Sequence, residues 1–420
     1  MAQAALNIDG LAFCTLDIEN ASVPPSMNMI ETILIMDGFG MGLPVMRMRL
    51  YDEDDKLSRD LNLKNGTLVT IRLGKSAQEA PSYKYRVFGW SRTRSSTGKI
   101  LSIVLIFDAP KFGAGAYSEY FEGATSLVMQ QMAELSGLKY DGPAKTTDDN
   151  QNWLNLNTTR LAFSEDVAMR GYANDQSCMA RLVSMDGTLI YKDLMALLNE
   201  TPKFSLAHNT DGAGGNGKVI NVRAAKDKSV AGLFTHYVNY GHKSFGHSFE
   251  DEFTAIETLD VKAQGAGLPV NPDVLAQLQE RGSRVSYTGL DYGTGPEEGF
   301  NVHEHYERAY YQNVRLLSLF SERLVAITDS ATELRSFSAI EFNQGAGAKG
   351  SSAPTPADVT GKYIVGGKCV VIKNGTKYSE VFYLYRPFIG EAGNTNGTSA
   401  AKTQVKASNS GVDTSSRNFT

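Results

Sequence analysis

Long apolar runs are missing from this sequence of 420 residues. No stretch reaches the roughly 18 apolar residues that a membrane-spanning helix needs, so we expect no membrane insertion. The first nine residues also lack the basic start and the apolar centre of a secretory signal peptide, which predicts a product made in the cytoplasm.

Cysteine and excess charge are scarce as well. Cys14, Cys178 and Cys369 lie far apart without the spacing of a metal site, and this usage indicates a reducing compartment. The formal net charge is −5, which argues against broad electrostatic binding to nucleic acid or to an anionic membrane.

Glycine and aromatic residues are plentiful instead. The 40 glycines, 19 tyrosines and 19 phenylalanines favour β structure with many tight turns. The chain is too long for a single comfortable core, so we expect two to four domains.

Residues 1–112 predict a first small antiparallel β-barrel. Apolar residues alternate along Pro44–Tyr51, Thr67–Leu73 and Tyr83–Trp90, and Ile100–Phe107 is nearly continuous in its apolar character. Asn65-Gly66 has the composition of a hairpin turn. Several strands at this regular spacing are typical of a barrel or sandwich.

Residues 113–202 predict an α/β insert. Apolar residues recur at helical spacing from Tyr117 to Leu135, and Gly137 stands where that helix would end. A second helix is expected from Asn174 or Asp175 to Met185, ending at Gly187. The strand Thr188–Tyr191 follows.

The next segments predict the start of a second barrel (203–260) and an insertion (261–318). Strands are expected over Lys203–His208, Val219–Arg223 and Leu233–Tyr240. The insertion is rich in Gly and Pro, with a short helix near Val274–Gln279. A long helix is expected from Val302 to Leu324.

The last segments predict the rest of the second barrel (319–390) and an extended C-terminal arm (391–420). Ser336–Phe342, Lys362–Lys373 and Tyr378–Pro387 are strand-like, and Asn374-Gly375 is a second hairpin signal. The arm is dominated by small and polar residues, so we expect neighbouring proteins to hold it.

A glycine-rich segment, Gly212-Ala-Gly-Gly-Asn-Gly217-Lys218, has the spacing of a loop that binds phosphates. Such a loop continues with Ser or Thr and a helix, whereas Val219-Ile-Asn-Val222 is rich in β-branched residues. We therefore interpret the segment as a hairpin loop and expect no nucleotide or other cofactor.

Histidines occur in two further groups. His236, His242 and His247 precede three carboxylates, Glu250 to Glu252, but their spacing fits neither a helical pair nor a zinc finger. His303-Glu304-His305 places its histidines on opposite sides of a helix, unlike the metal-binding arrangement. We interpret the first group as loop or subunit-contact residues and the second as a solvated helix start, and predict no metal site.

Hydrolase signatures are also incomplete. Gly241-His-Lys-Ser244-Phe-Gly246 misses the nucleophile elbow by one position. Glu297-Glu298 has no opposed partner, and Asp52-Glu-Asp-Asp55 is interpreted as a solvated turn. We predict no catalytic residue and no enzyme activity.

An ordered set of segments resembles the phage tail hub proteins, a family that includes the hub of contractile tails, the late-control tail proteins of temperate phages and the base of the type VI secretion spike. The segments of the first barrel are Met36-Asp-Gly-Phe-Gly-Met-Gly-Leu-Pro44, Met46–Tyr51-Asp52, Asn65-Gly-Thr-Leu-Val-Thr-Ile-Arg-Leu-Gly74 and Tyr85-Arg-Val-Phe-Gly89. Two further segments are similar to the family's insert: Glu122-Gly-Ala-Thr-Ser126 through Ala133-Glu-Leu-Ser-Gly137-Leu138, and Asn174–Tyr191. The resemblance covers residues 30–200 visibly and 320–390 faintly.

The resemblance implies a mainly β, α+β fold with two small antiparallel β-barrels of tail-tube type, an α/β insert and an extended C-terminal tail. It implies a homotrimer in the virion baseplate whose six barrels join a sixfold tail tube to a threefold central spike. Expected partners are the tail tube protein, the spike protein and other baseplate proteins, with DNA only in transit through the channel. Because no oligonucleotide-fold, needle or lysozyme-like segment is recognised, the spike is expected to be a separate polypeptide.

Three alternatives remain open. The chain could be another tail-tip component, such as a distal tail or tube-terminating protein. It could be a tail-associated cell-wall hydrolase, which would need a cleft with paired carboxylates or a metal. It could also be a carbohydrate-binding module, for which Tyr306, Tyr310 and Tyr311 are the hint.

Overall fold

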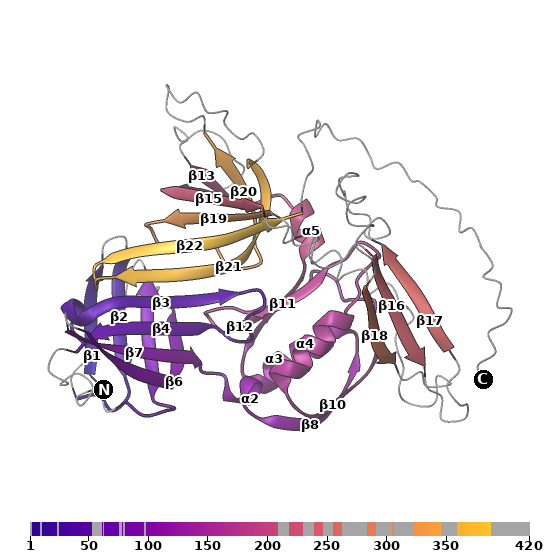
Figure 1. The fold of residues 1–420 in the computed structure, drawn as a ribbon, viewed down its shortest axis with the longest axis horizontal. Helices are drawn as coiled ribbons and strands as arrows, with labels where there is room; N and C mark the ends of the chain where they lie inside the picture. The colour runs from indigo at the N-terminus through magenta and orange to yellow at the C-terminus, as the bar shows by residue number, and fades with distance from the viewer. Residues whose placement is uncertain are drawn as a thin grey trace, which may run out of the picture.

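The structure, a computed structural model, describes residues 2–8, 11–22, 25–52, 61, 63–74, 78, 80–95, 98–208, 218–229, 239–246, 255–262, 284–290, 305, 319, 322–345 and 359–387. Over these residues the protein is mainly β, as predicted, with a few short helices (Figure 1). Among them, no helix has both the length and the apolar character needed to span a membrane.

Fourteen of the described strands form one large sheet. In chain order they are β1 (Ala2–Ile8), β2 (Leu11–Ile18), β3 (Ile30–Gly38), β4 (Val45–Tyr51), β5 (Leu68–Gly74), β6 (Ser82–Ser95), β7 (Gly98–Phe107), β13 (Phe204–His208), β14 (Lys218–Val222), β15 (Ala224–Ser229), β19 (Glu322–Thr328), β20 (Ala339–Gln344), β21 (Gly361–Lys373) and β22 (Lys377–Arg386).

The remaining elements are helices and small sheets. They are η1 (Met27–Met29), α2 (Pro110–Gly113), β8 (Ala116–Gly123), α3 (Thr125–Ser136), β9 (Lys139–Asp141), β10 (Gln151–Thr159), α4 (Arg160–Arg170), β11 (Met179–Val183), β12 (Thr188–Asp193), α5 (Leu194–Asn199), β16 (Asn239–Gly246), β17 (Ala255–Lys262) and β18 (Arg284–Leu290).

The period-two sequence pattern explains the strands of the first half. On β4, Met46, Met48 and Leu50 are fully buried, whereas Arg47 and Arg49 are exposed. The predicted strands over residues 44–51, 67–73, 83–90 and 100–107 are therefore confirmed. Together with β2 and β3 they enclose a first apolar core.

β21 joins the two halves of the large sheet. On one of its edges it pairs with β20 through Gly361–Ile364 and then with β3 through Gly367–Lys373. Its other edge pairs with β22 along nearly its whole length. Gly366 and Gly367 lie where β21 changes partner. A Cβ on Gly367 would lie only 2.9 Å from the Asp37 carbonyl oxygen, so the close approach of β3 to β21 requires glycine there. The yellow β21–β22 pair accordingly runs beside both groups of strands in Figure 1.

A second apolar core lies among β13, β14, β19, β20 and the adjoining halves of β21 and β22. β14 pairs with β13 and β15 pairs with β19, and a single residue, Arg223, separates β14 from β15. Strand pairing therefore runs from β13 through β20, β21, β22 and β19 to β15. The continuous segment that holds β14 and β15 then returns to β13, with which β14 pairs. Buried side chains such as Leu206, Phe342 and Phe382 fill its interior.

The insert contains two helices packed against the β8–β10 sheet. Thr125, at the start of α3, donates its backbone N–H to the buried Asp149 carboxylate at 2.8 Å. α3 ends as predicted at Gly137, which has a φ of 74°. The apolar faces of α3 and α4 share a core with Phe121 and Trp153.

In the insert, one predicted helix begins too early and the other is wrong. Residues 116–123 form β8, so Tyr117, Tyr120 and Phe121 precede the helix and lie on a strand. Residues 179–183 form β11, and Gly187, with a φ of 74°, lies in the turn to β12. Because every residue of β11 is buried, its apolar run lacks the alternation that separates a strand from a buried helix. The predicted strand over residues 188–191 is confirmed as part of β12.

Two further predictions are corrected. Asn65-Gly66 forms a turn, but β5 after it pairs with β2 and β6 and not with the preceding β4, so no hairpin forms there. Gly66 instead donates its N–H to the Val87 carbonyl at 2.7 Å. Leu324, the expected end of a long helix, lies on β19 and is buried in the second core.

The hairpin at Asn374-Gly375 is confirmed. Both residues have positive φ, 50° and 62°, and β21 and β22 pair from Lys373 and Lys377 onward. The strands predicted over 203–208, 219–223 and 336–342 are confirmed within a few residues. The expected helix near 274–279 and the arm 391–420 lie outside the described residues, as does most of the insertion 261–318. The domain boundaries stay a prediction.

Candidate functional site

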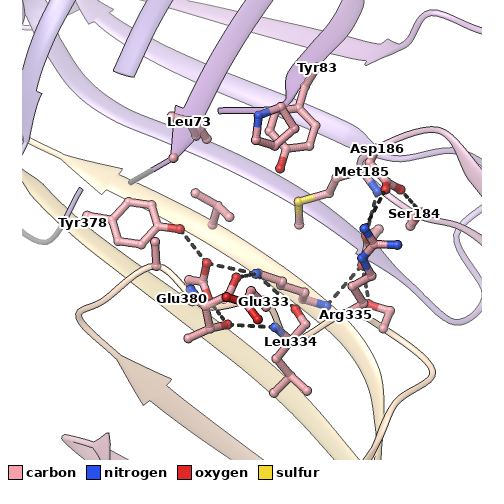
Figure 2. Close-up of a pocket in the computed structure, with 18 residues that line it drawn as sticks. Leu73, Tyr83, Ser184, Met185, Asp186, Glu333, Leu334, Arg335, Tyr378 and Glu380 are labelled. Carbon is pink, nitrogen blue, oxygen red and sulfur yellow. Dashed lines mark hydrogen bonds and ion pairs between the residues drawn. The ribbon is translucent and has the colours of Figure 1, made fainter. Parts of the chain in front are cut away.

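A cavity of about 490 Å³ lies where the first half of the large sheet, the β11–β12 turn and the β19–β20 loop meet β21 and β22 (Figure 2). Both apolar and charged side chains line it. The charged ones are Asp37, Asp186, Glu333, Arg335, Lys368 and Glu380.

Asp37, at the end of β3, connects three segments. Its carboxylate accepts hydrogen bonds from the Ser336 hydroxyl at 2.5 Å, the Met185 amide at 2.8 Å and the Lys368 amide at 3.3 Å. Burial raises the pKa of this carboxyl above its ordinary value, against the lowering effect of the donors and of the Lys368 charge.

Lys368 and Glu380 form a buried ion pair on β21 and β22. The Lys368 ammonium lies 2.9 Å from Glu380 Oε1, and the two side chains are 13% and 2% exposed. Glu380 also accepts hydrogen bonds from the hydroxyls of Tyr378 and Thr332, both at 2.6 Å. Lys368 donates to the Leu334 carbonyl at 3.2 Å, so the pair fixes the β19–β20 loop.

Asp186, in the β11–β12 turn, connects the insert to the same loop. It accepts from Ser184 at 2.5 Å and Thr188 at 2.9 Å, and lies 3.5 Å from the Arg335 guanidinium. Burial opposes ionisation of Asp186, but the two hydroxyl donors and nearby cations outweigh it and lower its pKa.

The polar atoms of this cavity mostly bind one another. None of its lining residues is a histidine or cysteine. In the described part of the chain no group of three or more His, Cys, Asp or Glu side chains is placed to hold a metal ion. The Ser336 hydroxyl donates to Asp37, and no histidine lines the cavity to act as the base that a serine hydrolase needs. These contacts hold the insert and both halves of the large sheet together.

The residues considered for phosphate and metal binding do not meet here. Residues 209–217 of the glycine-rich segment lie outside the described residues, while Lys218 opens a strand, as predicted, and pairs with Glu333 at 3.1 Å. His236, His247, Glu250, Asp251, Glu252, His303 and Glu304 also lie outside them. His305 stacks on the Tyr172 ring with 4.5 Å between centroids and lies 3.3 Å from Asp148.

The hydrolase candidates are likewise dispersed. Ser244 is in the middle of β16, pairing with residues of β17 and β18, and so is not at a strand-to-helix turn. Asp52 is 3% exposed, and its N–H donates to the Lys99 carbonyl at 2.9 Å, which corrects the prediction of a solvated position. Residues 53–55 and the pairs at 297–298 and 310–311 lie outside the described part of the chain.

Sequence reasoning missed Asp37, Lys368 and Glu380. A usable signal existed for Glu380, because Tyr378, Phe382 and Leu384 alternate on the same buried face of β22. A carboxylate on the apolar face of a strand predicts a buried partner. The partner's identity requires the tertiary structure.

Comparison with known proteins gives a result at the level of structure alone. No family model matches the sequence, and the curated proteins contain no significant match to it. Solved structures do match, among them two that align over nearly their whole length. A tail protein from Neisseria meningitidis MC58 has a TM-score of 0.53 and 7% identity, covering 92% of this chain and 97% of that one.

The second is the 43 kDa tail protein of prophage MuSo2 from Shewanella oneidensis, with a TM-score of 0.51 and 11% identity. The match covers 89% of this chain and 96% of that one. The chain has the fold of a phage tail protein. The resemblance to tail proteins seen in the sequence is therefore confirmed at the level of a mainly β tail-protein fold. An Escherichia coli type VI secretion component has a TM-score of 0.44, too slight a likeness to support an inference.

Proposed function

We propose that this protein is a structural component of a phage tail, and more specifically a homotrimeric baseplate hub that acts by geometry and not by catalysis. The observation that carries the proposal is the shared fold with two tail proteins over about nine-tenths of this chain. Such a component would reside in the virion, at the tail baseplate.

The two cores support the hub over a generic tail role. Each half of the large sheet curves around its own apolar cluster, and β21 and β22 belong to both. We propose that the halves correspond to two small barrels. Three chains would then present six barrels, which matches a sixfold tail tube on one side and a threefold central spike on the other.

The buried network of the cavity supports a rigid joint between those halves. Asp37, Lys368 and Glu380 bind the β19–β20 loop, β3, β21 and the β11–β12 turn to one another. A hub that transmits load between tube and spike requires fixed barrels. Partners would be the tube, the spike and other baseplate proteins, with DNA passing through the channel.

The test is the mass of the protein in solution, measured by light scattering over a concentration series. Three chains of 45.7 kDa, about 137 kDa, are expected. A mass that stays at one chain at every concentration, alone and with tube and spike proteins added, would contradict the hub. Zymography on cell-wall material would be expected to show no clearing.

A different tail-tip component, such as a distal tail or tube-terminating protein, is the second candidate. The shared fold alone is compatible with it, since the two matching structures are described as tail proteins without a position in the tail. A closed sixfold assembly in the same light-scattering series would favour this candidate over the hub.

A further inference from the structure

The second half of β6 has an open edge. β5 pairs with β6 from Ser82 to Arg86, and beyond that point β6 pairs with β7 alone among the described strands. A bulge at Phe88 separates the two parts, and the free part carries Trp90, Arg92 and Arg94. Phe88 and Trp90 are 68% and 43% exposed. An open edge of this kind is a template for pairing with another strand.

The charge of this edge is of one sign. The hairpin sequence from Phe88 to Ile106 contains Arg92, Arg94 and Lys99 and no acidic residue. Arg92 lies over the Trp90 ring at 5.1 Å, and Arg94 has no ion pair with a described residue. Two such edges would repel each other, so an acidic strand is the complementary partner.

β8 has the complementary properties. It pairs with β10 alone among the described strands, so its other edge is also open. Its sequence, Ala116–Gly123, contains Glu119 and Glu122 and no basic residue. Glu119 is held by Arg160, whereas Glu122 is exposed and has no ion pair with a described residue.

The solvent face of the β8–β10 sheet is apolar next to that carboxylate. Tyr120, Leu154 and Leu156 are 60%, 42% and 67% exposed, and the register places Tyr120 opposite Leu154. A basic strand added along the open edge of β8 would extend this sheet, and its arginines would lie beside Tyr120 and Glu122. Apolar contact flanked by charge pairs is a common composition of protein interfaces.

We propose that the open edge of β6 in one copy of this chain adds to the open edge of β8 in a second copy, with Arg92 beside Glu122 and Arg94 over Tyr120. The inference rests on the proposed function, which requires the chain to assemble with itself. The two surfaces differ, so the contact is head-to-tail, and a head-to-tail contact closes into a ring when its rotation permits. Pairing through backbone hydrogen bonds supplies affinity, and the charges select β8 over a second β6.

The test is a charge exchange, read by sedimentation velocity over a concentration series. Arg92→Glu and Glu122→Arg should each weaken self-association about tenfold or more per contact. The chain carrying both substitutions restores opposite charges across the contact and should recover to within about threefold of the wild type. Lys84→Glu is the matched control, because it makes the same charge change on the part of β6 already paired with β5.

Each outcome is decisive. Loss in both single variants with recovery in the double variant supports the contact. A stable threefold mass in both single variants would overturn this surface and leave the hub standing. Loss in the double variant as severe as in the singles would overturn the pairing of Arg92 with Glu122. A wild-type chain that never associates would overturn this contact and count against the hub as well.

Discussion

The ion pair between Lys368 and Glu380 allows a quantitative prediction. Replacing Lys368 by Met leaves the Glu380 carboxylate, 2% exposed, without its opposing charge. Breaking a buried pair from one side costs about 3–5 kcal/mol. We expect the lower end, because Tyr378 and Thr332 still donate to the carboxylate. Native proteins are stable by about 5–15 kcal/mol, so the loss is a large share of the total.

The companion variant decides whether the cause is the uncompensated charge. Lys368→Met combined with Glu380→Gln removes both charges and keeps an oxygen that accepts from Tyr378. We therefore expect the double variant to be more stable than Lys368→Met alone, with a residual loss of about 1–2 kcal/mol. Urea unfolding followed by circular dichroism at pH 7 measures both. A double variant no more stable than the single one would refute the reasoning.

Three further outcomes are expected. Burial raises the folded-state pKa of Asp37 above 3.8, so its stabilising contribution is complete below pH 3.8 and is lost as the pH rises through the folded pKa. Urea titrations at several pH values measure this loss. Relative to Asp37→Asn, the wild type should lose up to about 1.4 kcal/mol of unfolding free energy per pH unit over that window. Gly187→Ala adds a Cβ at a φ of 74° and 2.7 Å from the Phe107 ring, so it should cost about 2–4 kcal/mol of stability. Gly66→Ala, at a φ of 86° with open space around it, should cost about 1 kcal/mol. Equal losses of stability in thermal unfolding would contradict this. Burial raises the pKa of the Cys14 thiol to about 12 and that of Cys369 to about 11, and a thiol reagent should label no cysteine in the native protein and all three in denaturant; native labelling would show that the cores open.

The sequence predicted the strands of both halves well because each half-buried strand carries its own alternation. β4 and β22 are examples, since their inward residues are apolar and their outward residues are polar or mixed. The turn at Asn374-Gly375 was likewise predictable, because a tight hairpin requires two residues with positive φ.

The insert was predicted less well for a physical reason. β11 is buried on both faces and β8 has aromatic residues at spacings that also fit a helix, so local pattern did not distinguish strand from helix there. α4 was missed as well, although Thr159 caps its start by accepting from the Ala162 amide at 3.1 Å. Tertiary contacts with α3 and β10 decide these elements.

The sequence alone determined the mainly β class, most strand positions and the likeness to tail proteins, because these depend on neighbours in the chain. The tertiary structure decided that β3 and β20 share one edge of β21, and that Asp37, Lys368 and Glu380 meet at one joint. The contacts of Asp37 and β3 with β21 join residues more than 300 positions apart, as between Asp37 and Lys368. No local pattern encodes such a pairing, because it depends on how the whole sheet curves around its two cores.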